Sequence, residues 1–289
     1  MSAQLTGLSD IMPAKHQSDL TLTLCFLRGS VTLFCSDDVV LQLLSEHFRC
    51  FIAEQPPSLD RLVTAVITRD SETYTLIDNN GQTLSLLSLD RLLKETYRTV
   101  VSHWVEQHQD LLWLHAAAIK RDDRCLLLTG PWGAGKSTLT IGLLEQGWHY
   151  LSDDIVPFDP ATGCAHPFPV LPRKREVHRT DEIDLANAKK TPFPIPDAQL
   201  VREPVPVTGM IFPIYNGVNR ETSWGGIERI EAVKVLIENC ISFPLNEDKS
   251  IHALIALTMQ LPLARLHYFD IAAALTLIHL REHGERRTS

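Results

Sequence analysis

The most constraining feature of the sequence is the glycine-rich stretch GPWGAGKSTL at Gly130–Leu139. Its residues Gly130, Gly135, Lys136 and Ser137 fulfil the pattern G-x-x-x-x-G-K-[ST] of a phosphate-binding loop. The preceding CLLLT is typical of a buried strand, and the following STLTIGLLEQ is typical of a helix. A strand that passes into a helix through such a loop favours an α/β fold in which helices cover a sheet.

The loop predicts binding of a nucleoside triphosphate together with Mg²⁺. In loops of this type the backbone N–H groups and the positive end of the following helix wrap the β-phosphate. The lysine reaches the β and γ oxygens, and the serine hydroxyl ligates Mg²⁺. Because the loop grips phosphates, it does not distinguish ATP from GTP. We expect the nucleotide to be bound by Gly130, Pro131, Trp132, Gly133, Ala134, Gly135, Lys136, Ser137 and Thr138.

Two adjacent carboxylates, Asp153 and Asp154, follow the loop at an informative distance. A helix from Lys136 to about Gln146 would be ~16 Å long, and Gly147 is a natural helix stop. The residues WHYLS would then return ~16 Å as a strand. The matching lengths predict that both carboxylates come back to the bound phosphates.

The two carboxylates can divide the work of phosphoryl transfer, since one can hold Mg²⁺ and the other can orient or deprotonate an attacking hydroxyl. Neighbouring strand residues point to opposite faces, so the two carboxylates take different roles if the strand is still regular there. We expect Asp153 mainly at the metal, with Ser137, and Asp154 mainly as the base, although the sequence leaves the order of the two roles open. The plainer alternative is a turn, because the pairs Asp37–Asp38 and Asp122–Asp123 are explained by helix capping and turn chemistry.

His115 is a further candidate, because it lies on the strand before the loop within LHAAAI, where small residues leave room for a site. Its plainer interpretation is a histidine that is hydrogen-bonded within a sheet. The basic run Arg173, Lys174 and Arg175 also has two interpretations, a clamp for phosphates or an acidic substrate, or a solvated face. It belongs to the proline-rich passage 168–207, which predicts a loop over the site.

The segments LHAAAI, GPWGAGKST and GWHYLSDD together resemble the catalytic domain of the HPr serine kinase/phosphorylases. The resemblance is closer to the HPr-kinase-related bacterial kinases of unassigned substrate, and it is strongest over residues 115–158. It implies a P-loop kinase fold distantly shared with phosphoenolpyruvate carboxykinase, in which Lys136 and Ser137 bind ATP and Mg²⁺. It also implies that one of the two aspartates is the catalytic base, with His115 beside it. The implied catalytic set is Asp154, Asp153, His115 and Lys136.

The chain departs from that family downstream of the carboxylates. It has no clean match to the family's Glu-Ile-Arg-Gly-Leu-Gly-like segment, for which Glu176 is only a loose positional candidate, and none to its C-terminal glycine-rich loop. HPr itself as substrate and a reverse phosphorylase reaction are therefore not implied. Among other P-loop classes, a GTPase would carry N-K-x-D, which the sequence lacks. The distal run VLIEN lacks the aspartate that an AAA or transporter ATPase would carry.

Composition limits the partners. The formal net charge of −8 argues against nucleic acid or an anionic membrane as a partner. The sequence shows neither a signal-peptide pattern nor an apolar run of membrane-spanning length. The six cysteines are scattered singly, which is typical of reduced thiols. A cytoplasmic protein is the resulting expectation.

Two parts are expected along the chain. Residues 1–108 predict a small α+β module that binds a partner or forms a homo-oligomer, and residues 109–289 predict a P-loop kinase domain. The leading hypothesis is an ATP- and Mg²⁺-dependent kinase that transfers the γ-phosphoryl group to a hydroxyl, most simply a serine of a small protein or peptide. The alternatives are a kinase of a small metabolite and a non-catalytic nucleotide-sensing module.

Overall fold

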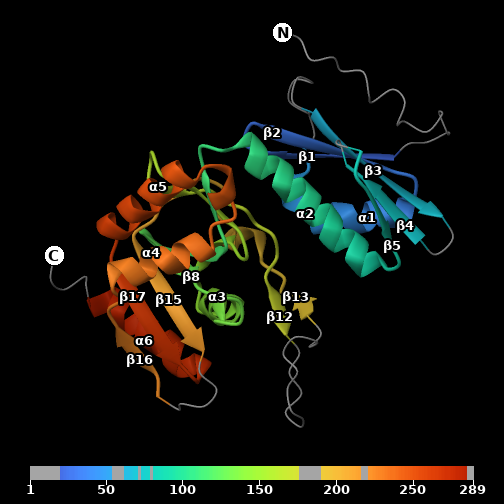
Figure 1. The fold of residues 1–289 in the computed structure, drawn as a ribbon. Coiled ribbons are helices and arrows are strands. Elements are labelled where there is room, and N and C mark those ends of the chain that lie inside the picture. The colour runs from blue at the N-terminus through green and yellow to red at the C-terminus, as the bar shows by residue number, and fades with distance from the viewer. Residues whose placement is uncertain are drawn as a thin grey trace. The chain divides into compact units, whose positions relative to one another are not determined.

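The computed structural model describes residues 20–53, 62–70, 73–78, 81–175, 190–215 and 221–284, which form a mixed α/β fold (Figure 1). The chain divides into two compact units, residues 1–108 and residues 109–289. Six α-helices and several sheets occur in the described part. None of the helices in these ranges combines the length and the hydropathy needed to cross a bilayer.

The first unit is a five-stranded sheet with two helices packed against it. The strand order is β1-β2-β3-β4-β5, in which β2 and β3 are parallel and the other neighbours are antiparallel. Its elements are β1 (Leu20–Phe26), β2 (Gly29–Cys35), α1 (Asp38–His47), the 3-10 turn η1 (Arg49–Phe51), β3 (Leu62–Asp70), β4 (Thr73–Ile77), β5 (Thr83–Leu86) and α2 (Leu89–Gln107).

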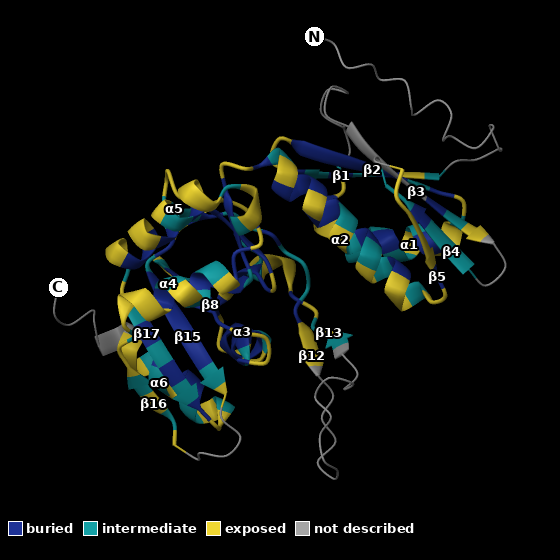
Figure 2. Cartoon of the chain, viewed as in Figure 1, coloured by how far each residue is buried: buried dark blue, intermediate teal, exposed yellow. Residues whose placement is uncertain are grey.

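The helices of this unit begin at capping side chains. The Asp37 carboxylate accepts hydrogen bonds from the backbone N–H groups of Val39 and Val40, which confirms the capping expected for it. Ser88 caps α2 in the same way. One face of α2 is buried, with the Trp104 side chain fully shielded (Figure 2). An amphipathic helix of this kind is held mainly by packing against its sheet.

The second unit is built on a six-stranded sheet with the order β16-β17-β15-β8-β7-β9. β8, β15 and β17 are parallel. β7 is antiparallel to both β8 and β9, so β9 runs in the same direction as β8. The carboxyl ends of β8, β9, β15 and β17 therefore lie at one edge of the sheet. The strands are β7 (Ala116–Arg121), β8 (Arg124–Thr129), β9 (His149–Ser152), β15 (Gly209–Tyr215), β16 (Ser223–Gly225) and β17 (Leu263–Tyr268).

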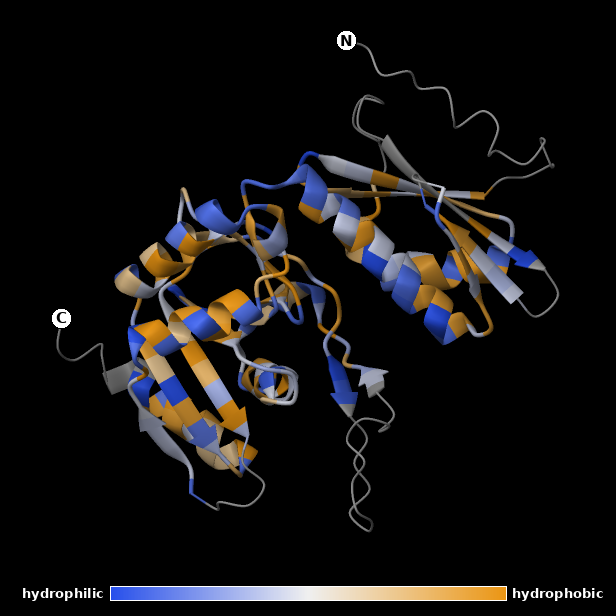
Figure 3. Cartoon of the chain, in the orientation of Figure 1, coloured by the Kyte–Doolittle hydropathy of each residue, from blue (hydrophilic) through white to orange (hydrophobic). Residues whose placement is uncertain are grey.

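Both faces of this sheet are covered. Ala117 and Ile119 of β7 belong to a core cluster shared with α3 (Lys136–Glu145) and α6 (Ile271–Gly284). Ala116 and Ala118 belong instead to a cluster shared with α4 (Arg229–Glu238) and α5 (Glu247–Gln260). Strands buried on both faces are apolar at nearly every position. β15 is accordingly mostly buried and hydrophobic, whereas α4 and α5 each have an exposed side on which hydrophilic and hydrophobic residues are mixed (Figures 2 and 3).

A smaller antiparallel sheet, β14-β11-β10-β6, shares the face covered by α4 and α5. Its Leu114 and Phe158 belong to the same core cluster as Leu236 of α4. Its strands are β6 (Leu112–Leu114), β10 (Val156–Asp159), β11 (Cys164–Ala165) and β14 (Val205–Pro206). The remaining elements are the paired strands β12 (Arg173–Arg175) and β13 (Lys190–Pro192) and the 3-10 turns η3 (Asp197–Gln199) and η4 (Phe243–Leu245).

The chain changes sheets at His115. The sequence predicts that His115 lies on the strand before the loop, and this prediction is wrong. β6 ends at Leu114 and pairs with β10, whereas β7 begins at Ala116 and pairs with β8 and β9. Between them, the His115 backbone N–H donates to the Asn239 carbonyl at 2.6 Å. The polar hairpin turn predicted between β7 and β8 is present, and Asp122 adopts a φ of 53° there.

Candidate functional site

The glycine-rich loop, Gly130–Ser137, joins the carboxyl end of β8 to the first turn of α3. Gly133 and Gly135 adopt φ values of 85° and 88°, in the left-handed region that favours glycine. A Cβ atom at Gly135 would overlap the hydroxyl of Tyr268, which lies against the loop at the end of β17. The strand, loop and helix expected from the sequence are therefore confirmed, and Gly135 is required both by its backbone conformation and by its neighbour.

The lysine of the loop is folded back onto it. Lys136 is buried, and its Nζ donates to the carbonyls of Gly130 at 2.7 Å and Pro131 at 3.3 Å. Burial lowers the pKa of Lys136, and the nearby charges of Asp153 and Asp154 oppose that shift. The ammonium group thus lies within the loop beside backbone oxygens, where the oxygens of an entering phosphate would compete for it.

Asp153 lies against the first turn of α3. Its side chain is only 4% exposed and accepts a hydrogen bond from the Ser137 side chain. Burial raises the pKa of Asp153 to about 6, with a further raising contribution from Asp154, while Ser137, Lys136 and His115 oppose the shift. Its second carboxylate oxygen, Oδ1, is buried without a hydrogen-bond partner among the described residues. The return of β9 has therefore brought this carboxylate to the loop, as the helix and strand lengths predict.

Asp154 has the opposite surroundings. Its side chain is 59% exposed, and its φ of 78° turns the chain sharply after β9. The His115 Nδ1 lies 2.9 Å from the Asp154 backbone oxygen and 3.1 Å from its Oδ1. The strand is no longer regular at this pair, because β9 ends at Ser152. The left-handed turn at Asp154, and not a strand pleat, separates the two side chains.

His115 lies at the break between β6 and β7. Because His115 precedes β7, and β7 is antiparallel to β8, the histidine reaches the edge of the sheet where the loop and the carboxylates lie. Its backbone is held by Asn239 at the end of α4, and its side chain contacts Asp154. It is therefore not a histidine satisfied inside a sheet ladder, which was the plainer interpretation of the sequence.

The donor set fits Mg²⁺ that arrives with a nucleotide. No group of three or more His, Cys, Asp or Glu side chains that could hold a metal by itself occurs among the described residues. Mg²⁺ keeps several waters and is usually bound through one or two carboxylates together with substrate phosphates. The Ser137 hydroxyl and the unpartnered Asp153 Oδ1 offer the oxygen ligands that such a site requires. Glu176 lies outside the described residues.

The basic run lies on β12, which contacts α3, the helix that follows the loop. Arg173 and Lys174 are exposed on β12, and the side chains at the base of the β12–β13 hairpin, Leu171 and Phe193, pack in a cluster with Leu144 near the C-terminal end of α3. The loop lies at the opposite end of that helix. Residues 176–189 of the proline-rich passage lie outside the described residues, so the predicted lid is not tested.

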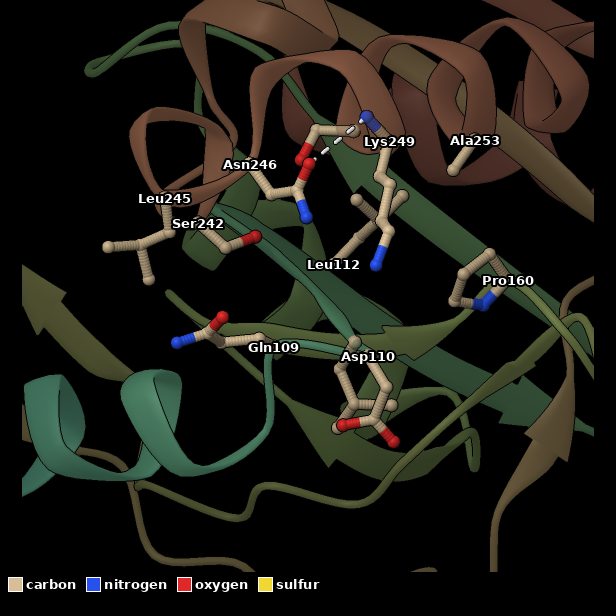
Figure 4. Close-up of a pocket in the computed structure, with 11 residues that line it drawn as sticks. Gln109, Asp110, Leu112, Pro160, Ser242, Leu245, Asn246, Lys249 and Ala253 are labelled. Carbon is tan, nitrogen blue, oxygen red and sulfur yellow. Dashed lines mark hydrogen bonds between the residues drawn. The ribbon is translucent and has the colours of Figure 1, made fainter. Parts of the chain in front are cut away.

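A small hollow of about 120 Å³ is lined by residues of α5 and of the segment at the start of β6 (Figure 4). Gln109 and Asp110 line one side of it, and Asn246 and Lys249 line another. None of the residues of the glycine-rich loop and neither Asp153 nor Asp154 takes part in its lining. The hollow therefore gives no support to a closed metabolite pocket beside the loop.

Sequence reasoning missed two aromatic residues at the same edge of the sheet, Tyr268 and Tyr215. The Tyr268 hydroxyl donates to the Ala134 carbonyl at 3.3 Å, and the Tyr215 ring packs edge-on against the Tyr268 ring at 5.5 Å. Tyr215 is the last residue of β15, and Tyr268 is the last residue of β17. Since the carboxyl ends of parallel strands form the ligand-binding edge of an open α/β sheet, the last residue of each strand could have been flagged.

No protein-family model matches the chain, and a search of curated proteins finds no match either. The function must therefore be argued from the residues of the site.

Proposed function

We propose that the protein is an ATP- and Mg²⁺-dependent kinase that transfers the γ-phosphoryl group to a hydroxyl, most simply a serine of a small protein or peptide. The observation that carries the proposal is the placement of two carboxylates beside the glycine-rich loop. Asp153 is buried against Ser137, and Asp154 is exposed beside His115. One environment suits a metal ligand, and the other suits a base that meets a substrate.

The loop and its lysine would bind the phosphates. Backbone N–H groups at the start of α3 would face the β-phosphate, and Lys136 would exchange its two carbonyl partners for phosphate oxygens. Ser137 and Asp153 would hold Mg²⁺, which when bound neutralises the charge of the β and γ oxygens. Entry of a cation beside Asp153 would favour its ionised form over the protonated form that burial favours.

Asp154 would act on the acceptor hydroxyl. The hydroxyl oxygen forms the new bond to the γ-phosphorus as the bond from that phosphorus to the β–γ bridging oxygen breaks, and the hydroxyl proton passes to the Asp154 carboxylate. His115 would hold this carboxylate in place through the contacts of its Nδ1. The products are ADP and a phosphorylated hydroxyl.

We infer a P-loop kinase fold of the HPr kinase and phosphoenolpyruvate carboxykinase type for residues 109–289. For residues 1–108 we infer a partner-binding or oligomerising role. All six cysteines are free, which supports a reducing compartment such as the cytoplasm.

The test is transfer of label from γ-³²P-ATP to serine-containing proteins and peptides encoded beside this gene. Wild type is compared with Lys136→Ala and Asp154→Asn, and Asp123→Asn serves as a control because Asp123 is an exposed carboxylate in the β7–β8 turn. We expect label on a neighbour's hydroxyl, lost in the first two variants and kept in the control. Tight ATP binding that survives Asp154→Asn, with no transfer to any candidate, would favour the nucleotide sensor instead.

A further inference from the structure

Two features of the loop's surroundings carry no role in the proposed chemistry, namely the tyrosines that end β15 and β17. Tyr215 and Tyr268 are register partners across the parallel pair β15–β17. Tyr268 is 2% exposed and contacts the loop through Ala134, whereas Tyr215 is 46% exposed. The Tyr215 ring is therefore held near the loop by its contact with Tyr268, while the rest of the ring is open to solvent.

The sheet order gives a direction to any nucleotide in the loop. β9, which ends at Asp153, lies two strands from β8 on one side, and β15 adjoins β8 on the other. If the γ-phosphate lies at Asp153 and Asp154, the rest of the nucleotide extends away from β9, toward the ends of β15 and β17. From β9 to β15 there are three strand spacings, or about 14 Å. That span is comparable to the length of an extended nucleoside triphosphate.

From this geometry we propose that Tyr215 forms the nucleobase subsite, with its exposed ring stacked on the base of the nucleotide whose phosphates lie in the glycine-rich loop. The inference rests on the proposed function for the identity of the ligand as a nucleotide. Tyr268 links the two halves of the site, because it contacts the loop through its hydroxyl and Tyr215 through its ring.

Among the described residues that end β15 and β17, no side chain is seen to be reserved for one base. The nearest carboxylate after β17, Asp270, accepts a hydrogen bond from the Ala273 N–H at 2.8 Å and so caps α6. The sequence also lacks the N-K-x-D segment that reads guanine in GTPases. Stacking tolerates any base, because every base has a π face. The subsite therefore takes both purines, which answers the question of ATP against GTP that the loop leaves open.

The test measures binding to the full-length chain by calorimetry, with ADP, GDP, UDP and inorganic tripolyphosphate as ligands. Replacing a stacked aromatic by alanine weakens nucleotide binding by about five- to a hundredfold. We expect Tyr215→Ala to weaken ADP and GDP binding by that factor while tripolyphosphate binding is unchanged. We expect Tyr215→Phe, which keeps the ring, to bind ADP as wild type does. Thermal unfolding establishes that both variants fold.

Three outcomes would overturn the subsite. Tyr215→Ala could bind ADP as tightly as wild type. It could also lose affinity for ADP and for tripolyphosphate by the same factor, which would mean that the ring acts only through the loop. Finally, the base-selective loss could appear in Trp132→Ala in place of Tyr215→Ala, since Trp132 is the exposed aromatic residue of the loop itself. Wild type alone provides a further check, because a preference for ADP over GDP of about a hundredfold would require a hydrogen-bonded base and would contradict stacking.

Failure of the subsite and failure of the proposed function give different results. Wild type and Tyr215→Ala that bind tripolyphosphate equally and also bind ADP equally refute the base subsite and leave the phosphate loop intact. Wild type that binds neither ligand refutes the nucleotide site and, with it, the subsite. A Tyr215-dependent affinity for ADP without phosphoryl transfer supports the subsite in a nucleotide sensor.

Discussion

The Ser137 side chain donates a hydrogen bond to the Asp153 carboxylate, which connects the first turn of α3 to the end of β9. The two residues are separated by a helix and a strand that match in length. This bond leaves Asp153 with one buried oxygen that has no partner in the described residues. An arrangement that buries a carboxylate without satisfying it costs stability, and such costs are typical of functional sites.

The first prediction concerns the stability cost of Asp153. Its pKa is raised by burial to about 6, above the value of 3.8 for an unperturbed aspartate. As pH rises from 4 to 6, the unfolded chain loses this proton first, so ionisation of Asp153 reduces the free energy of unfolding, by about 3 kcal/mol at most above pH 6. We expect Asp153→Asn to raise the melting temperature at pH 8 without Mg²⁺ and to have a smaller effect at pH 4.5. If Asp153→Asn lowered the melting temperature equally at both pH values, the prediction that ionised Asp153 destabilises the fold would be contradicted.

The second prediction concerns His115 as a positioning residue. It contacts Asp154 through Nδ1 and lies outside the glycine-rich loop. We expect His115→Ala to reduce kcat by at least about tenfold, because Asp154, the proposed base, would be less well oriented, while the KM for ATP changes little. Steady-state kinetics with a phosphorylated peptide product measures both constants. A rise in the KM for ATP with an unchanged kcat would show that His115 binds the nucleotide instead.

The third prediction concerns the metal. If Ser137 and Asp153 hold Mg²⁺ beside the phosphates, chelation of divalent cations should weaken ATP binding by wild type. We expect Ser137→Ala to bind ATP more weakly in Mg²⁺ and to show little further change on chelation, because the metal contribution is already reduced. Calorimetry with and without EDTA measures this difference. A Ser137→Ala variant that responds to Mg²⁺ as fully as wild type would remove Ser137 from the metal site.

The parts that sequence could predict are those set by local pattern. The strand, loop and helix around Lys136 follow from periodicity and glycine spacing, and the return to Asp153 follows from matching lengths. The parts that it could not predict depend on distant partners. The change of sheet at His115 depends on a carbonyl at Asn239, and the close approach to Gly135 depends on Tyr268. Neither pairing leaves a trace in the local sequence.

The last prediction compares two glycines of the loop. Gly133 and Gly135 have nearly the same left-handed φ, but a Cβ atom at Gly133 would have no neighbour within 4 Å, whereas one at Gly135 would overlap the Tyr268 hydroxyl. Gly133→Ala should therefore lower the free energy of unfolding only by the strain of a left-handed alanine, about 1–2 kcal/mol. Gly135→Ala should cost more. Melting temperatures measure both, at about 2–4 °C for each kcal/mol in a unit of this size.

The hydroxyl of Tyr268 can be removed to separate the two contributions. In a Tyr268→Phe background the closest atom to a Cβ at Gly135 is lost, so we expect the cost of Gly135→Ala to fall toward that of Gly133→Ala. Tyr268→Phe alone should cost about 1 kcal/mol, because it removes the hydrogen bond to Ala134. Equal costs for Gly135→Ala in the two backgrounds would show that the tyrosine moves aside, and that the conformation of the loop does not depend on the end of β17.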